Sequence, residues 1–360
     1  MPQNIYDLDY VELEKIIKTW GYPSYRTKQI WQGLYQHYYS KPEEFTTLPR
    51  LIRDKLSEQF CEPDFEKTIS FSKLNPSTVQ LSSDRETRKT LFALKDGRLI
   101  EAVLMRYDKR QTLCISSQAG CAMGCVFCAT GQMGFFRHLS SGEIVEQVIF
   151  YARLLAREGK PVTNVVIMGM GEPFHNYEAT ISAIDRLNHE DGMNLGARRF
   201  TISTVGLTPV IRRFAAEKRQ INLAVSLHAA ENELRQSMLP VNKKYPLEDL
   251  MASCKEYIEQ THRRITFEWA LIEGVNDTPE QAQKLGKLLG SLRTQEGALL
   301  VHVNAIPLNP TRKYHGKATS HERAASFQLE LQKLGIPCTI RIRRGIDIQA
   351  GCGQLAGTSS

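Results

Sequence analysis

The sequence predicts an α/β protein built on a partial (β/α)6 barrel, which follows a small helical N-terminal domain and a β-hairpin extension. Three patterns predict this fold: helical spacing of apolar residues before residue 62, strands joined by a tight turn near residue 97, and repeated strand–helix units after residue 140. Such repeated units with apolar strands imply a parallel sheet covered by helices. Five strands after residue 140 and one that ends near Ser116 are too few for an eight-stranded barrel, so we expect an incomplete one.

The first 62 residues are predicted to form a helical accessory domain. Leu13, Ile16 and Ile17 fall on one stripe of a helix that starts near Asp9. Further helices are predicted over 25–38 and 49–60. A module of this size either caps the barrel or contacts nucleic acid, and the pattern alone leaves both interpretations open.

Residues 63–110 are predicted to form the β-hairpin extension, with strand patterns from Phe65 onward. Two runs of strand-forming residues, 90–94 and 98–105, flank Asp96-Gly97, a dipeptide typical of tight hairpin turns. Another strand is expected over 112–116, at the start of the barrel region 111–345.

The barrel region alternates strands and helices up to a Gly-rich tail. The expected strands cover 165–168, 200–203, 222–226, 265–269 and 300–304, and the expected helices cover 141–158, 176–188, 208–217, 247–260 and 279–292. A last helix over 320–334 and a strand over 339–343 precede the tail, residues 346–360. In this architecture ligands bind at the C-terminal ends of the strands, so side chains just after strands are candidate site residues.

The composition is that of a globular protein without a membrane anchor. The 360 residues include 46 Lys and Arg against 39 Asp and Glu, a net charge of +7, and 42% are apolar. There is no run of about 18 apolar residues, and the start lacks the basic and apolar segments of a secretory signal. We therefore expect a cytoplasmic protein, in which eight cysteines suit a metal site or redox chemistry better than a disulfide framework.

The sequence Cys121-Ala-Met-Gly-Cys125-Val-Phe-Cys128 is the strongest chemical signal in the chain. Its C-x3-C-x2-C spacing places three thiols on one short loop, and thiolates are the preferred ligands of iron–sulfur clusters. Three thiolates on a four-iron cluster leave one iron open to bind another molecule. The alternatives are free thiols or a zinc site completed by Cys114 or His138, although zinc loops more often come as paired C-x2-C knuckles.

This motif, with Phe127 before the third Cys, resembles the signature of the radical S-adenosylmethionine (SAM) enzymes. Gly169-Met-Gly-Glu172-Pro173, directly after a predicted strand, resembles the glycine-rich segment of that superfamily, whose backbone meets the methionine amino group. Within the superfamily the chain resembles the RlmN/Cfr family of ribosomal RNA adenine methyltransferases over nearly its whole length. The resemblance is carried by segments 113–121, 169–173, 201–203, 226–228, 304–310 and 351–355, and in the last of these Gly351 stands where Ala is usual.

The resemblance implies a radical SAM barrel that holds a [4Fe-4S] cluster on Cys121, Cys125 and Cys128 and uses two SAM molecules per turnover. It also implies that SAM is bound by residues at or just after strand ends: Gly171, Glu172, Ser203, Ser226, Leu227, His228 and Asn309. Taken singly, Ser203 and Ser226 also fit helix N-caps, His228 a buried structural histidine, and Asn309 a turn residue.

The implied reaction is methylation of C2 of an adenine: adenine 2503 in the peptidyl transferase centre of 23S rRNA, and adenine 37 of tRNA. C2 lies between two ring nitrogens and is a poor nucleophile, so radical addition is credible where direct attack on SAM is not. By the resemblance, Cys352 carries the methyl group, Glu101 takes the C2 proton, and Cys114 resolves the adduct by forming a disulfide with Cys352. The plain alternatives are an inert tail thiol and a solvent-facing hairpin glutamate.

An RNA substrate also agrees with the distribution of basic residues. Lys and Arg gather at 341–344, 312–317 and 263–264, and the helical domain contributes Lys15, Lys18, Arg26 and Lys28. The segment 341–344, expected to place Arg341 and Arg343 on one strand face, is the first choice for contacts near the target base. The reductant is expected to be an electron donor such as flavodoxin or ferredoxin, and the enzyme to act as a monomer away from membranes.

Three alternatives remain open at this point. In the nearest one, the same fold and cofactors methylate C8 of the same rRNA adenine, as in the Cfr branch, because the motifs are shared. The second is a zinc-stapled RNA-binding protein without catalytic activity. The third is a radical enzyme of another reaction type, but it gives no reason for Cys114 and Cys352 to occur together with the basic segment.

Overall fold

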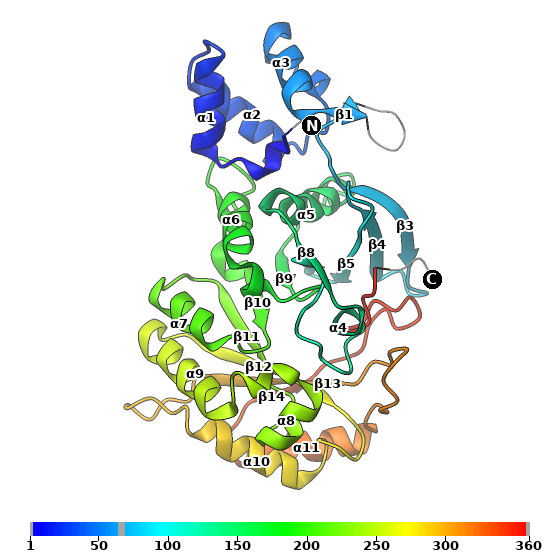
Figure 1. Cartoon of the computed structure of the whole chain (residues 1–360), viewed down its shortest axis with the longest axis vertical. Coiled ribbons are helices and arrows are strands. Elements are labelled where there is room, and N and C mark those ends of the chain that lie inside the picture. Colours follow the sequence, from blue (N-terminus) through cyan, green and yellow to red (C-terminus); the bar gives the residue numbers. More distant parts are fainter. Residues whose placement is uncertain (1–2, 64–68, 358–360) are drawn as a thin grey trace.

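The computed structural model describes residues 3–63 and 69–357. In these ranges ten strands form one curved sheet in the order β14-β13-β12-β11-β10-β9-β6-β5-β4-β3, with free edges at β14 and β3 (Figure 1). Six neighbouring strands are parallel and correspond to the predicted barrel strands: β6 (Arg110–Cys114), β9 (Asn164–Ile167), β10 (Phe200–Thr204), β11 (Asn222–Ser226), β12 (Ile265–Leu271) and β13 (Val301–Pro307). The prediction of a partial barrel is confirmed.

A short parallel strand, β14 (Cys338–Ile340), extends the barrel at one edge. It ends earlier than the strand predicted over 339–343. The Arg341 N–H still donates to a β13 carbonyl, at 2.8 Å, but the guanidinium groups of Arg343 and Arg344 then bind carbonyls outside the ladder. Arg341 and Arg343 therefore do not share a strand face, and the prediction is wrong beyond residue 340.

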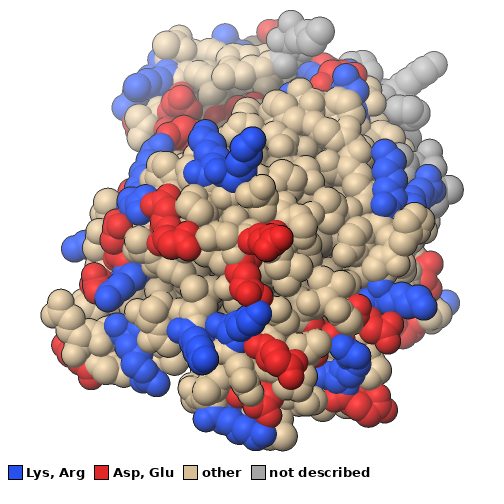
Figure 2. Space-filling view, turned by 60° about the horizontal axis from the view of Figure 1, so that its bottom comes forward, with Lys and Arg blue, Asp and Glu red and all other residues tan. Residues whose placement is uncertain are grey.

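Helices that return the chain from one strand to the next cover the outer face of the parallel sheet. They are α5 (Ser141–Ala156), α6 (Tyr177–Asn188), α7 (Thr208–Ala216), α9 (Leu247–Thr261), α10 (Pro279–Gly290) and α11 (His321–Lys333), and each confirms a predicted helix. On the face of the molecule shown in Figure 2, Lys and Arg are interspersed with Asp and Glu. The short helices α4 (Ala129–Met133) and α8 (Asn232–Met238) fall where the sequence predicts no element, because so few residues give little periodicity.

Three antiparallel strands continue the barrel sheet beyond β6. They are β3 (Asn75–Leu81), β4 (Thr87–Ala93) and β5 (Leu99–Tyr107), and β5 pairs with β6. β4 and β5 confirm the predicted hairpin, with Asp96-Gly97 in its turn. β3 lacks an alternating pattern, because it is a mostly exposed edge strand with a bulge after Pro76. The predicted start of the strands at Phe65 and the tail residues 358–360 lie outside the described residues.

Two small antiparallel pairs lie outside this sheet: β1 (Glu62–Pro63) with β2 (Ile69–Ser70), and β7 (Gln118–Gly120) with β8 (Phe135–His138). The second pair brackets the cysteine motif and α4. No helix in the described part of the chain is long and apolar enough to cross a membrane.

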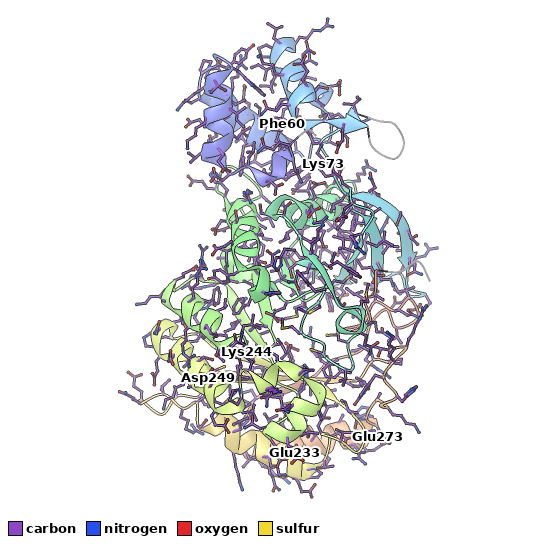
Figure 3. All side chains as sticks on the ribbon, in the orientation of Figure 1. Phe60, Lys73, Glu233, Lys244, Asp249 and Glu273 are labelled. Atoms are coloured by element: carbon purple, nitrogen blue, oxygen red, sulfur yellow. The ribbon has the colours of Figure 1, made fainter. Side chains whose placement is uncertain are left out.

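The N-terminal helices α1 (Tyr10–Thr19), α2 (Tyr25–Tyr35) and α3 (Arg50–Phe60) form a module at one end of the molecule, next to α5 and α6 (Figure 1). Buried polar contacts join it to the barrel. The Glu146 carboxylate on α5 accepts hydrogen bonds from the Asn4 amide (2.8 Å) and the Lys73 N–H (2.7 Å). The Lys73 ammonium donates to the Phe60 carbonyl at the end of α3, at 2.8 Å (Figure 3). The predicted helical module is therefore confirmed and is fixed to the barrel.

Candidate functional site

The three motif cysteines lie on a loop between β7 and α4. The Cys121 N–H donates to the Gly134 carbonyl (2.9 Å), and the Val126 N–H donates to a carbonyl at the end of α8 (3.1 Å). The loop also packs closely on α4, because a Cβ on Gly131 would lie 2.9 Å from the Cys125 nitrogen. Backbone contacts thus fix the loop, while its three thiols form no disulfide.

These thiols suit a metal cluster better than a single ion. Burial raises the pKa of Cys121 to about 12 and that of Cys125 well above its ordinary value, and neighbouring thiolates raise both further. Thiols in such surroundings ionise when bound metal supplies positive charge. Among the described residues, no three His, Cys, Asp or Glu side chains converge where one metal ion could sit. Thiolates on one short loop are the ligands that a [4Fe-4S] cluster takes, each on its own iron corner.

His138 is engaged elsewhere and does not complete a zinc site. Its Nδ1 lies 3.0 Å from the Gln118 amide nitrogen, and its ring packs edge-on against His175, with 4.8 Å between centroids. The same Gln118 nitrogen lies 3.1 Å from the His175 Nδ1. The His138 ring is therefore engaged by Gln118 and His175.

The C-terminal tail folds over the cysteine loop and brings Cys352 to it (Figure 1). The Ala129 N–H, directly after Cys128, donates to the Gly353 carbonyl at 2.7 Å. The Asn309 amide donates to the Cys352 carbonyl at 3.0 Å. A Cβ on Gly353 would lie only 3.9 Å from the Cys128 Cα, so the tail packs directly on the loop.

Cys114, the last residue of β6, belongs to the same site. Burial raises the pKa of Cys114 and of Cys352 to about 12. The charges of Glu268, Cys114 and Cys128 raise the pKa of Cys352 further. Cys352 is exposed. Both cysteines are reduced.

Glu101 is buried on β5, with 2% of its side chain exposed. One carboxylate oxygen lies 3.0 Å from the Lys89 ammonium. The other accepts hydrogen bonds from the N–H groups of Ala356 (2.7 Å) and Gly357 (3.2 Å), shortly after Cys352. The interpretation of Glu101 as a solvent-facing hairpin residue is therefore wrong, and the carboxylate is tied to the tail.

The Gly-rich segment 169–173 packs against β7. Gly171 has a φ of 103°, and a Cβ there would lie 2.6 Å from the Gln118 side chain, so only glycine fits. The Glu172 carboxylate accepts hydrogen bonds from the N–H groups of Phe174 (3.0 Å) and Val205 (2.8 Å), and burial raises its pKa to about 7. The carboxylate thus fixes the turn, and a ligand at this segment would meet its backbone.

Ser203 on β10 and Ser226 at the end of β11 face each other, with their Oγ atoms 3.4 Å apart. Neither is a helix N-cap, because Leu207 precedes α7 and Glu231 precedes α8, so that interpretation is wrong. The next residue, Leu227, is fully buried, and its N–H donates to a β12 carbonyl at 3.0 Å. Leu227 therefore supports the site from the core and presents no side chain to a ligand.

His228 and Asn309 follow the ends of β11 and β13, at the same edge of the parallel sheet as Ser226. The His228 Nδ1 accepts a hydrogen bond from the Ala270 N–H at 2.9 Å, and its ring meets Phe127 edge-on at 5.0 Å. Burial lowers the pKa of His228 to about 3, so the ring is neutral. Asn309 is 4% exposed, and its Oδ1 has no hydrogen-bond partner in the described ranges. A buried acceptor without a partner indicates a ligand that donates to it.

Known proteins resemble the chain over its full length. A model of the radical SAM superfamily matches residues 115–285, and one of the ribosomal RNA large subunit methyltransferase N-terminal domain matches residues 3–61. A crystal structure of a radical SAM methyltransferase from Sphaerobacter thermophilus superposes with a TM-score of 0.92 and 45% identity, covering 99% of this chain and 100% of that one. A probable dual-specificity RNA methyltransferase RlmN from Chloroflexus aurantiacus is 46% identical over 99% of this chain and 93% of the relative. In Myxococcus xanthus, dual-specificity RNA methyltransferase RlmN 1 is 47% identical over 99% and 94%.

The chain belongs to the RlmN family. It is therefore a radical SAM methyltransferase that acts on RNA and uses a [4Fe-4S] cluster and SAM. The alternatives of a zinc-stapled, non-catalytic RNA-binding protein and of a radical enzyme of another reaction type are wrong.

Two buried charged residues of this RlmN-family site, Lys89 and Glu268, are not among the residues predicted from the sequence. Lys89 pairs with Glu101, and Glu268 on β12 accepts a hydrogen bond from the Asn304 amide at 3.0 Å. Burial raises the pKa of Glu268 to about 7. Glu268 carries a usable signal, because this charge lies within the apolar run 265–271, whereas Lys89 follows other charged residues and carries none.

Proposed function

We propose that this RlmN-family enzyme methylates C2 of adenine, at adenine 2503 of 23S rRNA and adenine 37 of tRNA. The observation that carries the proposal is the contact between the tail loop around Cys352 (residues 349–357, the Cys352 loop) and the loop of the three motif cysteines (the cysteine loop). The Ala129 N–H donates to the Gly353 carbonyl across this contact, at 2.7 Å. This contact supports the assignment of Cys352 as a further thiol close to the three that would hold the cluster. Such a thiol can carry a carbon between SAM and the RNA base.

Cys121, Cys125 and Cys128 would hold the [4Fe-4S] cluster, which with SAM supplies a 5′-deoxyadenosyl radical. We assign SAM binding to the strand-end residues described above: the backbone of Gly171 and Glu172, the side chains of Ser203, Ser226, His228 and Asn309, and Leu227 as their support. His228 can donate through Nε2, because its Nδ1 accepts from Ala270. Asn309 can accept through its unpartnered Oδ1.

In the proposed reaction Cys352 is the methyl carrier. Its thiolate displaces the methyl group of one SAM, which gives S-methylcysteine and S-adenosylhomocysteine. The Cys352 methyl group then loses one hydrogen atom to the radical derived from a second SAM, and its carbon adds to C2 of the adenine. Two SAM molecules are consumed in each turnover.

Glu101 and Cys114 complete the proposed cycle. Glu101 would accept the proton from C2, and the [4Fe-4S] cluster held by Cys121, Cys125 and Cys128 would supply the acceptor for the electron that the base gives up. The Cys114 thiolate then attacks the Cys352 sulfur, so that an S–S bond forms, the C–S bond breaks, and the departing carbon takes a proton to become the methyl group. This step needs the two Cα atoms to approach within about 7 Å. The reduced state of both thiols is the state that precedes it.

Mass spectrometry of RNA after anaerobic reaction tests this function. Reconstituted wild-type enzyme with SAM and a reductant should add one methyl group to C2, and Cys352→Ala should add none. Cys61→Ala, which removes a buried thiol of the helical module, is the matched control and should keep activity. A methyl group on C8 would support the Cfr-type reaction instead, and methylation by Cys352→Ala would exclude the carrier role.

We also infer which surface contacts RNA and which kind of partner supplies electrons. Arg341 and Arg343 are exposed just before the Cys352 loop and suit phosphate contacts near the target base. In the helical module Lys18 and Lys28 already form ion pairs with acidic side chains, at 3.0 and 2.6 Å, so this surface is the second choice. The enzyme is proposed to act as a monomer with an electron donor such as flavodoxin or ferredoxin.

A further inference from the structure

Lys89 and Glu101 form a buried ion pair on the hairpin, against the tail that carries Cys352. In the β4–β5 register Leu91 pairs with Glu101 and Lys89 with Val103, which places the two charged residues diagonally on one sheet face. Their charged atoms lie 3.0 Å apart, and the side chains are 7% and 2% exposed. Burial removes the solvation of both charges, and their attraction offsets this only partly, so stability alone is a weak reason for such a pair.

The pair holds the tail on both sides of Cys352. The Lys89 ammonium reaches the Gln349 carbonyl at 3.4 Å. The Glu101 Oε2 accepts hydrogen bonds from the N–H groups of residues 356 and 357, at 2.7 and 3.2 Å. Both ends of the loop 349–357 are therefore fixed to one buried ion pair, and Cys352 lies between them.

A glycine makes the second of these contacts possible. Gly357 has a φ of 58°, and a Cβ there would lie 2.8 Å from the Leu99 carbonyl at the start of β5. The tail can approach β5 this closely only without a side chain. Gly357→Ala should therefore lift the end of the loop from Glu101 while leaving both charged residues in place.

Both oxygens of Glu101 are occupied in this arrangement, Oε1 by Lys89 and Oε2 by the tail. We propose that Lys89 is a positioning residue, and that its pair with Glu101 is a latch that holds both ends of the loop 349–357 on the hairpin while no RNA is bound. Opening of the latch frees Oε2 for the RNA base and loosens both ends of the loop, so that Cys352 can turn towards Cys114, while the Ala129–Gly353 hydrogen bond keeps the loop beside the cysteine motif. The inference rests on the roles proposed above for Glu101 and Cys352.

Amide hydrogen–deuterium exchange of residues 349–357 in the cluster-loaded, full-length enzyme tests the latch. Lys89→Met keeps the apolar stem and removes the charge. Exchange at residues 356 and 357 should become at least about tenfold faster, because Glu101 loses the partner that fixes it. Lys89→Arg should restore slow exchange. Lys109→Met, which alters an exposed lysine in the turn between β5 and β6, should leave exchange unchanged.

Gly357→Ala provides a second, independent arm. It should give the same fast exchange, and adding Lys89→Met to it should have little further effect, because both substitutions open one latch. This arm decides the question even if Lys89→Met does not fold. Slow exchange in both single variants, or equally fast exchange in Lys89→Arg and Lys89→Met, overturns the latch.

RNA should act on the latch from the substrate side. An RNA fragment that contains the target adenine should speed exchange at residues 356 and 357 in the wild-type enzyme, and slower exchange on RNA binding would overturn the proposed opening. None of these exchange measurements monitors methyl transfer. Failure of the latch therefore stays distinguishable from failure of the proposed reaction, which the RNA products report.

Discussion

At the scale of single residues, His228 combines a φ of 62° with a hydrogen bond to a buried N–H group and a ring contact to Phe127. His228→Leu leaves the Ala270 N–H without its acceptor in the core, which should destabilise the fold by about 1–3 kcal/mol. His228→Asn tolerates the positive φ and offers an amide oxygen, so it should recover part of the loss. Thermal unfolding measures both variants, and a Leu variant as stable as wild type would contradict this role.

Removal of Cys114 and removal of Cys352 should stop the reaction at different steps. Cys352→Ala has no carrier and forms neither product nor adduct. Cys114→Ala keeps the carrier but lacks the resolving thiol, so the reaction should stop after the carbon has joined the base. A covalent RNA–protein adduct should then persist on a denaturing gel, and Cys114→Ala/Cys352→Ala, the control, should show none. Release of methylated RNA by Cys114→Ala at the wild-type rate would remove Cys114 from the mechanism.

At the scale of elements, Glu146 on α5 decides how firmly the helical module sits on the barrel. Glu146→Ala leaves the Asn4 amide, the Ser72 hydroxyl and the Lys73 N–H without their common acceptor. The loss should be about 2–3 kcal/mol, and the module should melt before the barrel in calorimetry. Glu158→Ala, which removes a partly exposed ion pair with Arg106, is the control and should cost less than about 1 kcal/mol. A single unchanged transition for Glu146→Ala would contradict this view.

The sequence predicts those helices and hairpins whose characteristic residues all lie within the element itself. α5 has an apolar stripe and a capping box between Ser140 and Glu143, and Asp96-Gly97 predicts its hairpin directly. Where the length or exposure of a strand depends on contacts with distant parts of the chain, the sequence pattern does not predict it. β3 is an exposed edge strand, and β14 ends at Ile340 because the following Arg side chains bind carbonyls outside the ladder.

At the scale of the whole molecule, the candidate site joins segments that no local pattern connects. The cysteine loop could be predicted as one motif, because its three thiols lie within eight residues. The burial of Glu101, its pairing with Lys89 and its hold on the tail depend on the tertiary packing of the hairpin against residues 349–357. The resemblance to a family supplied Glu101 and Cys352 as candidates, but the contact of Glu101 with the tail that carries Cys352 is visible only in the folded chain.

Whole-molecule charge leads to the last prediction, which concerns RNA binding. The face shown in Figure 2 mixes both signs of charge, and Arg341 and Arg343 are exposed just before the Cys352 loop. Arg341→Glu/Arg343→Glu should weaken RNA binding and lower the slope of log Kd against log salt by about one for each lost phosphate contact. Lys255→Glu/Lys287→Glu on α9 and α10 makes the same change in net charge at exposed positions and should have a smaller effect. Filter binding at several salt concentrations measures both pairs, and equal losses would mean that net charge, rather than the 341–343 segment, attracts the RNA.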